Sequence, residues 1–198
     1  MTIGVLGGTF NPIHIGHLVL AQEIRIKLNF SKVLFVPSRL PPHKENTVSE
    51  THRYEMVKLA IKNNKFFEIS DIEMVQKKTS YTINTMKSLY QRYQEPLSFI
   101  IGADNIADMP SWNKWNELIR ICQFVIGMRP GVNSKLAKEQ LKYLKNIHGK
   151  SFNAVIIDIP GIEISSTQIR KRFKKNQSIK YFVPDSVIKY IERHSLYN

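Results

Sequence analysis

Two histidines near the start of the chain, His14 and His17, have the residue type and the spacing for chemistry on a phosphate group. Residues three apart on a helix share one face, so the two imidazoles would lie side by side. An imidazole donates hydrogen bonds and can carry a proton near neutral pH. Two such groups could hold a triphosphate and stabilise the charge that develops during phosphoryl or nucleotidyl transfer. The alternative is that one histidine caps the helix while the other packs against a sheet.

The residues around the histidines predict a strand, a glycine turn and a helix, in that order. Residues 3–6 form a short apolar run with β-branched members, which indicates a buried strand. Gly7 and Gly8 follow and would let the backbone turn tightly or approach a ligand closely. A helix is expected from Ile15 onward. This order points backbone N–H groups and the positive end of a helix dipole at one place, which favours a phosphate site.

A second set of hydroxyl side chains precedes another predicted helix near the end of the sequence. Ser165, Ser166 and Thr167 are of helix-capping types, and residues 168–173 continue with a helical pattern that includes Arg170. Hydroxyl and amide donors together with a guanidinium could cradle the β- and γ-phosphates of a nucleotide. Taken alone, the same stretch also fits an ordinary cap before a basic surface helix.

The rest of the chain alternates apolar runs with helical patterns, which predicts βαβ units and a mostly parallel sheet. Ligands of such sheets lie beyond the carboxyl ends of the strands. Residues with special roles fall at those ends: Gly7, Gly8, Pro37, Gly102, Asp104 and Arg129. Strands are expected at 32–36, 66–70, 97–102, 124–127 and 154–157. Helices are expected at 50–63, from Thr82 to Tyr90 with Thr79 or Ser80 as cap, in a segment that Trp112 and Trp115 enter, and from Ser134, as cap, to about His148.

Composition limits the class of protein. The 198 residues, 42% hydrophobic and 10% aromatic, suffice for one globular core and predict a single domain. The one cysteine, Cys122, excludes an internal disulfide framework and fits a reducing cytoplasm. No signal-peptide pattern and no apolar stretch of membrane-spanning length are present, so we expect a cytoplasmic protein without a membrane partner.

The formal net charge of +13 suggests an anionic partner, which could be a nucleotide, a nucleic acid or a membrane surface. The lysines are scattered along the sequence rather than gathered in one stripe. Most of this charge is therefore expected to lie on solvated surface, and we expect no nucleic-acid partner.

Residues 8–17, with the sequence GTFNPIHIGH, resemble the signature of the HxGH nucleotidyltransferases, and residues 164–170 are similar to the ISxTxxR motif of that superfamily. The resemblance spans nearly the whole chain. It implies an α/β, Rossmann-like, doubly wound and mostly parallel sheet with helices on both faces, in one domain (1–198) that includes a helical region from about 165. It also implies catalytic roles for His14, His17 and Arg170. Implied ATP-binding residues are Gly7, Gly8, Thr9, Phe10, Gly102, Asp104, Ser165, Ser166 and Thr167. Many members carry Asp where this chain has Asn11.

Within that superfamily the chain most resembles bacterial nicotinate-nucleotide adenylyltransferases, through residues 41–44, 81–82, 102–104, 112–115 and 129–131. Those enzymes join nicotinate mononucleotide to ATP and release deamido-NAD and pyrophosphate. Substrate-binding residues are then expected at Lys44, Tyr81, Thr82, Trp112 and Arg129. The residue types agree: an indole offers a flat face to a pyridine ring, and Lys44 and Arg129 could neutralise a phosphate. Trp115 is expected in the core.

The expected reaction needs no protein base, because the attacking phosphate is already anionic. Mg²⁺ would be carried by ATP, and no dedicated protein metal site is expected, since the sequence shows no cluster of metal-ligand type. Two alternatives stay open. One is adenylyl transfer to nicotinamide mononucleotide or phosphopantetheine. The other is a basic nucleic-acid-binding protein with a Rossmann-like core. The sequence also leaves open whether the chain forms a homo-oligomer.

Overall fold

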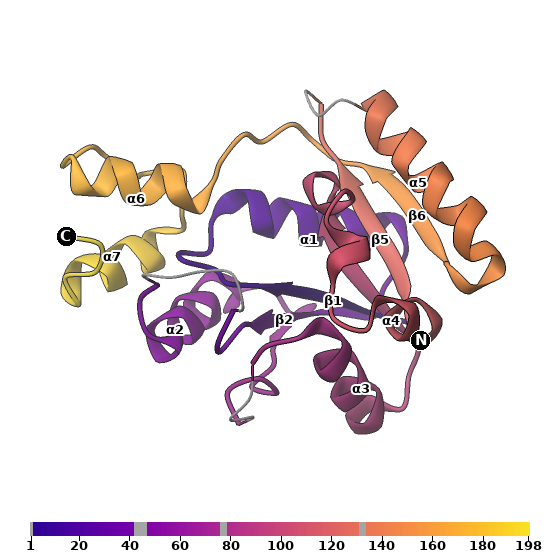
Figure 1. Cartoon of the computed structure of the whole chain (residues 1–198). Helices are drawn as coiled ribbons and strands as arrows, with labels where there is room; N and C mark the ends of the chain where they lie inside the picture. Colours follow the sequence, from indigo (N-terminus) through magenta and orange to yellow (C-terminus); the bar gives the residue numbers. More distant parts are fainter. Residues whose placement is uncertain (1, 42–46, 76–78, 131–133) are drawn as a thin grey trace.

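The structure is a computed structural model that describes residues 2–41, 47–75, 79–130 and 134–198. Its described strands form one parallel sheet in the order β3-β2-β1-β4-β5-β6 (Figure 1). The strands are β1 (Ile3–Gly8), β2 (Lys32–Pro37), β3 (Phe67–Ile69), β4 (Leu97–Gly102), β5 (Gln123–Met128) and β6 (Ala154–Asp158). The predicted α/β, doubly wound fold is confirmed. The strand order reverses between β1 and β4, and a ligand site is expected beyond the carboxyl ends of strands at such a point.

The helices connect these strands and extend beyond the last one. They are α1 (Ile15–Lys27), α2 (Glu50–Ile61), α3 (Thr82–Tyr93), α4 (Trp115–Ile121), α5 (Ser134–His148), α6 (Ser166–Lys174) and α7 (Asp185–Arg193). The described ranges also contain short 3₁₀ turns: η1 (Ala103–Asn105), η2 (Met109–Ser111) and η3 (Gly149–Ser151). The predicted helices are confirmed, whereas α7 was not predicted as a separate helix. The expected cap at Thr79 or Ser80 is wrong: Tyr81 is the N-cap of α3, with no side-chain cap hydrogen bond. The Ser80 hydroxyl instead accepts from the backbone N–H of Leu40.

Alternating side chains of the strands build one apolar layer on each face of the sheet. In β2, Leu34 and Val36 pack in the layer that holds α3, α4 and α5, whereas Val33 and Phe35 pack in the layer that holds α1, α2, α6 and α7. Figure 1 shows α6 and α7 at one end of the molecule, with the C-terminus beside them. Helix α7 packs against α2, the helix that follows β2.

The expected turn at Gly7 and Gly8 is wrong in its position. Both residues belong to β1, where they pair with Val36 and Pro37. The left-handed backbone position comes later, at Phe10, whose φ is 48°. A Cβ on Gly8 would lie 3.0 Å from the Phe10 ring, so this glycine makes room for the ring. The close contact that the structure shows at Gly8 is with a protein side chain, and its approach to a ligand stays a prediction.

A glycine at the end of β5 sets how closely the first helix lies on the sheet. A Cβ on Gly127 would lie 2.2 Å from Cδ1 of Leu20 in α1. The absence of a side chain therefore lets α1 pack directly over the end of β5. None of the helices in the described ranges is both long enough and apolar enough to cross a membrane.

Candidate active site

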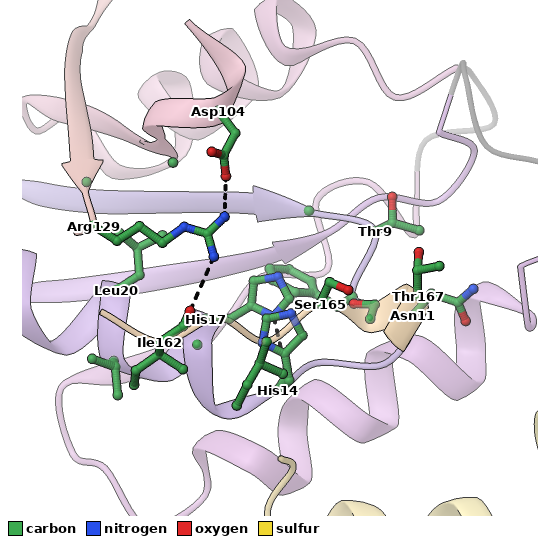
Figure 2. Close-up of a pocket in the computed structure, with 18 of the residues that line it drawn as sticks. Thr9, Asn11, His14, His17, Leu20, Asp104, Arg129, Ile162, Ser165 and Thr167 are labelled. Carbon is green, nitrogen blue, oxygen red and sulfur yellow. Dashed lines mark hydrogen bonds and ion pairs between the residues drawn. The ribbon is translucent and has the colours of Figure 1, made fainter. Parts of the chain in front are cut away.

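A pocket of about 630 Å³ lies at the carboxyl ends of β1, β4 and β5, between the first turns of α1 and α6 (Figure 2). His17 and Thr167, from opposite ends of the sequence, both line it. Most of the residues predicted for the site share this lining: Gly8, Thr9, Phe10, His14, His17, Gly102, Asp104, Arg129, Ser165, Ser166, Thr167 and Arg170. The two motifs of the sequence therefore converge in one cavity.

The two histidines are organised as a stacked pair. Their ring centroids lie 3.7 Å apart with an interplanar angle of 27°. His14 is the N-cap of α1, and its backbone N–H donates to Nδ1 of His17 over 3.2 Å. A ring nitrogen that accepts a hydrogen bond carries no proton, so the neutral His17 ring carries its proton on Nε2. The helix start thus fixes His17 as a donor through Nε2.

His14 is held in its neutral form. Its side chain is 6% exposed, and Nδ1 has no hydrogen-bond partner among the described residues. Burial, with a smaller contribution from the positive charge of Arg129, lowers the pKa of His14 to about 4. A Cβ on Gly16 would lie 3.1 Å from this Nδ1, so Gly16 lets the ring pack over the first turn of α1. Near neutral pH His14 therefore meets a ligand as a neutral, polar imidazole.

The loop between β1 and α1 is held by side-chain donors from two other helices, α2 and α6. The Arg53 guanidinium donates through Nη1 to the Thr9 carbonyl over 2.9 Å. Arg170 donates to the Asn11 carbonyl over 2.7 Å, and the Ser166 hydroxyl to the Pro12 carbonyl over 2.8 Å. These bonds fix the loop conformation in which Thr9 and Phe10 line the pocket.

Phe10 anchors the same loop from inside. It is 2% exposed, and its ring meets His17 edge-on at a centroid distance of 5.0 Å and Phe35 at 6.0 Å. A positive φ is uncommon for a bulky residue, so packing has to stabilise it. The ring of Phe10 accordingly ties the loop to both the core and the histidine pair.

Arg53 is the residue that sequence reasoning missed most completely. It lies on α2, is 1% exposed and donates to four backbone carbonyls, those of Thr9, Ser38, Arg39 and Val48. These carbonyls belong to the loop after β1, the segment after β2 and the residue before the cap of α2. The only available signal was a charged residue within an otherwise buried helix face, beside Met56 and Val57.

At the start of α6 the hydroxyls are partly used for structure. Ser165 is the N-cap, and its hydroxyl accepts from the backbone N–H of Gln168 over 3.1 Å. The Thr167 hydroxyl accepts from Nη2 of Arg170 over 3.3 Å. The stretch is therefore a helix cap, and it also lines the pocket. Its role in holding phosphates stays a prediction.

Asp104 and Arg129 are paired with each other. Nη2 of Arg129 donates to the Asp104 carboxylate, and its Nη1 donates to the Ile162 carbonyl over 3.2 Å. Figure 2 shows Arg129 stretched between these two partners. The pair joins η1 to the segment that leads into α6. A ribose or phosphate that used either side chain would have to compete with this ion pair.

Five predicted residues do not appear in the described lining of the pocket. Gly7 faces Phe99: a Cβ on Gly7 would lie 3.3 Å from the Phe99 ring. Tyr81 is exposed at the N-cap of α3, beside Thr82. Trp112 is half-buried, with its ring at right angles to Phe99 and centroids 5.9 Å apart. Lys44 lies outside the described residues. The substrate roles of Lys44, Tyr81, Thr82 and Trp112 stay predictions.

Trp115 lies in the core, as predicted. It is 6% exposed, and its indole N–H donates to Nε2 of His148 over 3.1 Å.

The rest of the lining was not predicted. Apolar side chains from α1 and from the segment after β6 form much of it, together with Thr47 and Asn105. These apolar members are Val19, Leu20, Ile159, Pro160, Ile162 and Ile164. They give the pocket an apolar wall beside its polar loops, which suits a flat ring attached to a phosphate chain. Across the described ranges, no three His, Cys, Asp or Glu side chains are grouped closely enough to hold a metal ion.

Comparison with known proteins agrees with the motifs. Residues 5–172 match the family model described as Cytidylyltransferase-like. A probable nicotinate-nucleotide adenylyltransferase of Thermoanaerobacter sp. (strain X514) is 40% identical over 100% of this chain and 94% of its own. The nicotinate-nucleotide adenylyltransferase of Bacillus subtilis (strain 168) is 39% identical over 98% of this chain and 97% of its own.

The solved structures agree on the fold. Nicotinic acid mononucleotide adenylyltransferase of Plasmodium falciparum, complexed with NaAD, has a TM-score of 0.82 at 24% identity, over 99% of this chain and 97% of that one. At this identity the likeness supports the fold alone. The resemblance inferred from residues 8–17 and 164–170 is confirmed by the sequence matches. The chain therefore belongs to the cytidylyltransferase-like family and, within it, to the nicotinate-nucleotide adenylyltransferases.

Proposed function

We propose that this chain transfers the adenylyl group of ATP to nicotinate mononucleotide, giving deamido-NAD and pyrophosphate in NAD biosynthesis. The observation that carries the proposal is the meeting of two helix starts, His14–His17 and Ser165–Thr167, in one pocket at the sheet's reversal point. Helix N-termini favour anions, and two of them facing one cavity suit a polyphosphate. The full-length identity with nicotinate-nucleotide adenylyltransferases supports this choice of acceptor.

The reaction is an in-line displacement at phosphorus. A phosphate oxygen of the mononucleotide forms a bond to the α-phosphorus of ATP, while the bond from that phosphorus to the bridging oxygen breaks and pyrophosphate leaves. The attacking phosphate is already anionic, so catalysis consists of positioning and charge stabilisation. His17 donates through Nε2 to the α-phosphate region, with neutral His14 stacked behind it.

The departing end of the triphosphate lies at the start of α6 in this proposal. A guanidinium has five N–H groups, so Arg170 can keep its bond to Asn11 and still donate to a phosphate. The backbone N–H groups at the start of α6 add further donors. Ser166 and Thr167 line this side of the pocket.

ATP enters as its magnesium complex. In the described lining Asp104 is the sole carboxylate, and it is already paired with Arg129, so the phosphate oxygens rather than the protein would hold the ion. Hydroxyl, imidazole and guanidinium donors fit the remaining phosphate oxygens. When bound, the ion neutralises part of the charge of the triphosphate.

The acceptor is assigned to the residues that the family motifs indicate. Trp112 offers an aromatic face, Tyr81 and Thr82 offer donors at the start of α3, and Lys44 and Arg129 carry the charge for the phosphate. The whole of 1–198 acts as one nucleotidyltransferase domain in this proposal, with the helical region from about 165 completing the ATP site. The single cysteine, which is buried, fits a cytoplasmic location.

The test is a side-by-side assay of pyrophosphate release with ATP and magnesium. Nicotinate mononucleotide, nicotinamide mononucleotide and phosphopantetheine serve as separate acceptors. We expect release with nicotinate mononucleotide well above the other two. Equal or faster release with another acceptor would overturn the assignment of the acceptor. Salt-sensitive RNA binding without acceptor-dependent release would instead support the nucleic-acid alternative.

A further inference from the structure

The end of the described chain returns to the loop that lines the ATP pocket. The Tyr197 hydroxyl donates to Oδ1 of Asn11 over 2.8 Å, across 186 positions of sequence. Tyr197 itself has a φ of 69°, in the left-handed region that bulky residues seldom adopt. The last turn after α7 is thus shaped so that this ring reaches the loop between β1 and α1.

The surroundings keep the Tyr197 hydroxyl a donor. The ring is half-buried in the apolar layer of α2 and α7, and burial raises the pKa of its hydroxyl. The nearby positive charges of Arg170 and Arg53 act in the opposite direction but are the smaller effect. The hydroxyl therefore keeps its proton at neutral pH, and the side-chain oxygen of Asn11 accepts a hydrogen bond from it.

Asn11 is held on both its main chain and its side chain. Its carbonyl accepts from Arg170, its side-chain oxygen accepts from Tyr197, and it is 5% exposed. It also lines the pocket, between Thr9 and the first turn of α1. Among the hydrogen bonds described for this loop, that from Tyr197 is made to a side chain, whereas Arg53, Arg170 and Ser166 donate to main-chain carbonyls.

We propose that Tyr197 is a positioning residue for ATP: its hydroxyl fixes the Asn11 side chain and, with it, the loop that holds the triphosphate. The proposal rests on the proposed function and extends it to the C-terminal segment. Asn11 then has a role that needs no charge, because its amide oxygen accepts a hydrogen bond from the hydroxyl, as a carboxylate oxygen would.

Tyr197 could instead serve only as packing for the layer of α2 and α7. Replacing the residue with phenylalanine separates the two roles, because Tyr197→Phe keeps the ring and removes only the hydroxyl. The chain offers a matched control in Tyr190→Phe. Tyr190 is also half-buried in the C-terminal part, and its hydroxyl lies 3.0 Å from Nδ1 of His52, away from the pocket.

The experiment measures ATP affinity by calorimetry, without acceptor, in wild type and both variants. Loss of one neutral hydrogen bond corresponds to about a fivefold change in an equilibrium constant. We expect Tyr197→Phe to weaken ATP binding about fivefold and to raise KM for ATP, with KM for the mononucleotide unchanged. Tyr190→Phe should change neither. An equal effect of the two variants on ATP affinity would overturn the proposal.

A double-mutant cycle with Asn11→Ala adds a test that packing alone would not meet. If the hydroxyl acts through Asn11, then Tyr197→Phe should have no further effect on ATP affinity in the Asn11→Ala background. Fully additive effects would overturn the proposal. Because ATP affinity is measured without acceptor, the result is independent of which acceptor the pyrophosphate assay identifies.

Discussion

The backbone N–H of His14 donates to Nδ1 of His17, and the two rings stack at 3.7 Å. The start of α1 therefore orients the ring of His17, the candidate catalytic residue. Because Nδ1 of His17 accepts a hydrogen bond, Nε2 is the ring nitrogen that can donate to a ligand. The spacing of the two histidines therefore sets the proton position of His17 as well as its place on the helix.

Replacing His17 with alanine should lower kcat by about two to three orders of magnitude, the usual effect of removing one preorganised donor to developing charge. The circular dichroism spectrum should be unchanged, since His17 is only partly buried. The matched control is His194→Ala, at the C-cap of α7 and outside the pocket. Near-normal turnover of His17→Ala would remove His17 from the catalytic role.

His14 should make stability depend on pH. Its pKa is about 4 in the folded chain against an ordinary value of 6.5, so between these values the unfolded chain binds more protons. Stability from this residue is therefore complete above pH 6.5 and is lost as the pH falls toward 4. The full loss is about 3 kcal/mol, at about 1.4 kcal/mol for each pH unit of difference.

Urea unfolding of wild type and His14→Asn between pH 7.5 and 4.5 measures this effect. Asparagine is a good N-cap and does not titrate, so it serves as the reference. The free energy of unfolding of wild type should fall more steeply than that of the variant below pH 6.5. Parallel pH profiles would contradict a buried neutral His14.

Local sequence patterns were sufficient to predict the parallel sheet and the location of the pocket at the carboxyl ends of its strands. Apolar runs such as 97–102 are buried on both faces, so they appear in the sequence as continuous apolar strands that end in glycine or proline. The position of the pocket then follows from the topology. Helix α7 was missed although Val187 and Ile191 have helical spacing and both are buried.

The features that were missed depend on contacts between distant segments. The turn at Phe10 is stabilised by a ring that packs on His17 and Phe35, and nothing next to Phe10 indicates a positive φ. Asp104 and Arg129 were predicted separately as ligands, but they face each other because β4 and β5 are neighbours in the sheet. Such pairings become visible only when the strand order is known.

Arg53→Met should destabilise the chain strongly. The change leaves four backbone carbonyls without their donor, and loss of one partner of a buried polar network costs about 3 to 5 kcal/mol. Urea unfolding at pH 7.5 measures the loss. Arg120→Met, at an exposed position of α4, is the matched control and should change the free energy of unfolding by less than about 0.5 kcal/mol. Similar free energies for the two variants would show that the buried guanidinium is dispensable.

Trp112→Ala should raise KM for nicotinate mononucleotide much more than KM for ATP, if its ring is the platform for the pyridine. Trp112 is half-buried beside Phe99 and Phe124, so part of its face stays accessible at the end of η2. The matched control is Trp115→Phe: Trp115 is buried and bonded to His148, so this change should lower stability with both KM values unaltered. Equal increases of the two KM values in Trp112→Ala would argue that Trp112 supports the fold of the loop rather than the ring of the acceptor.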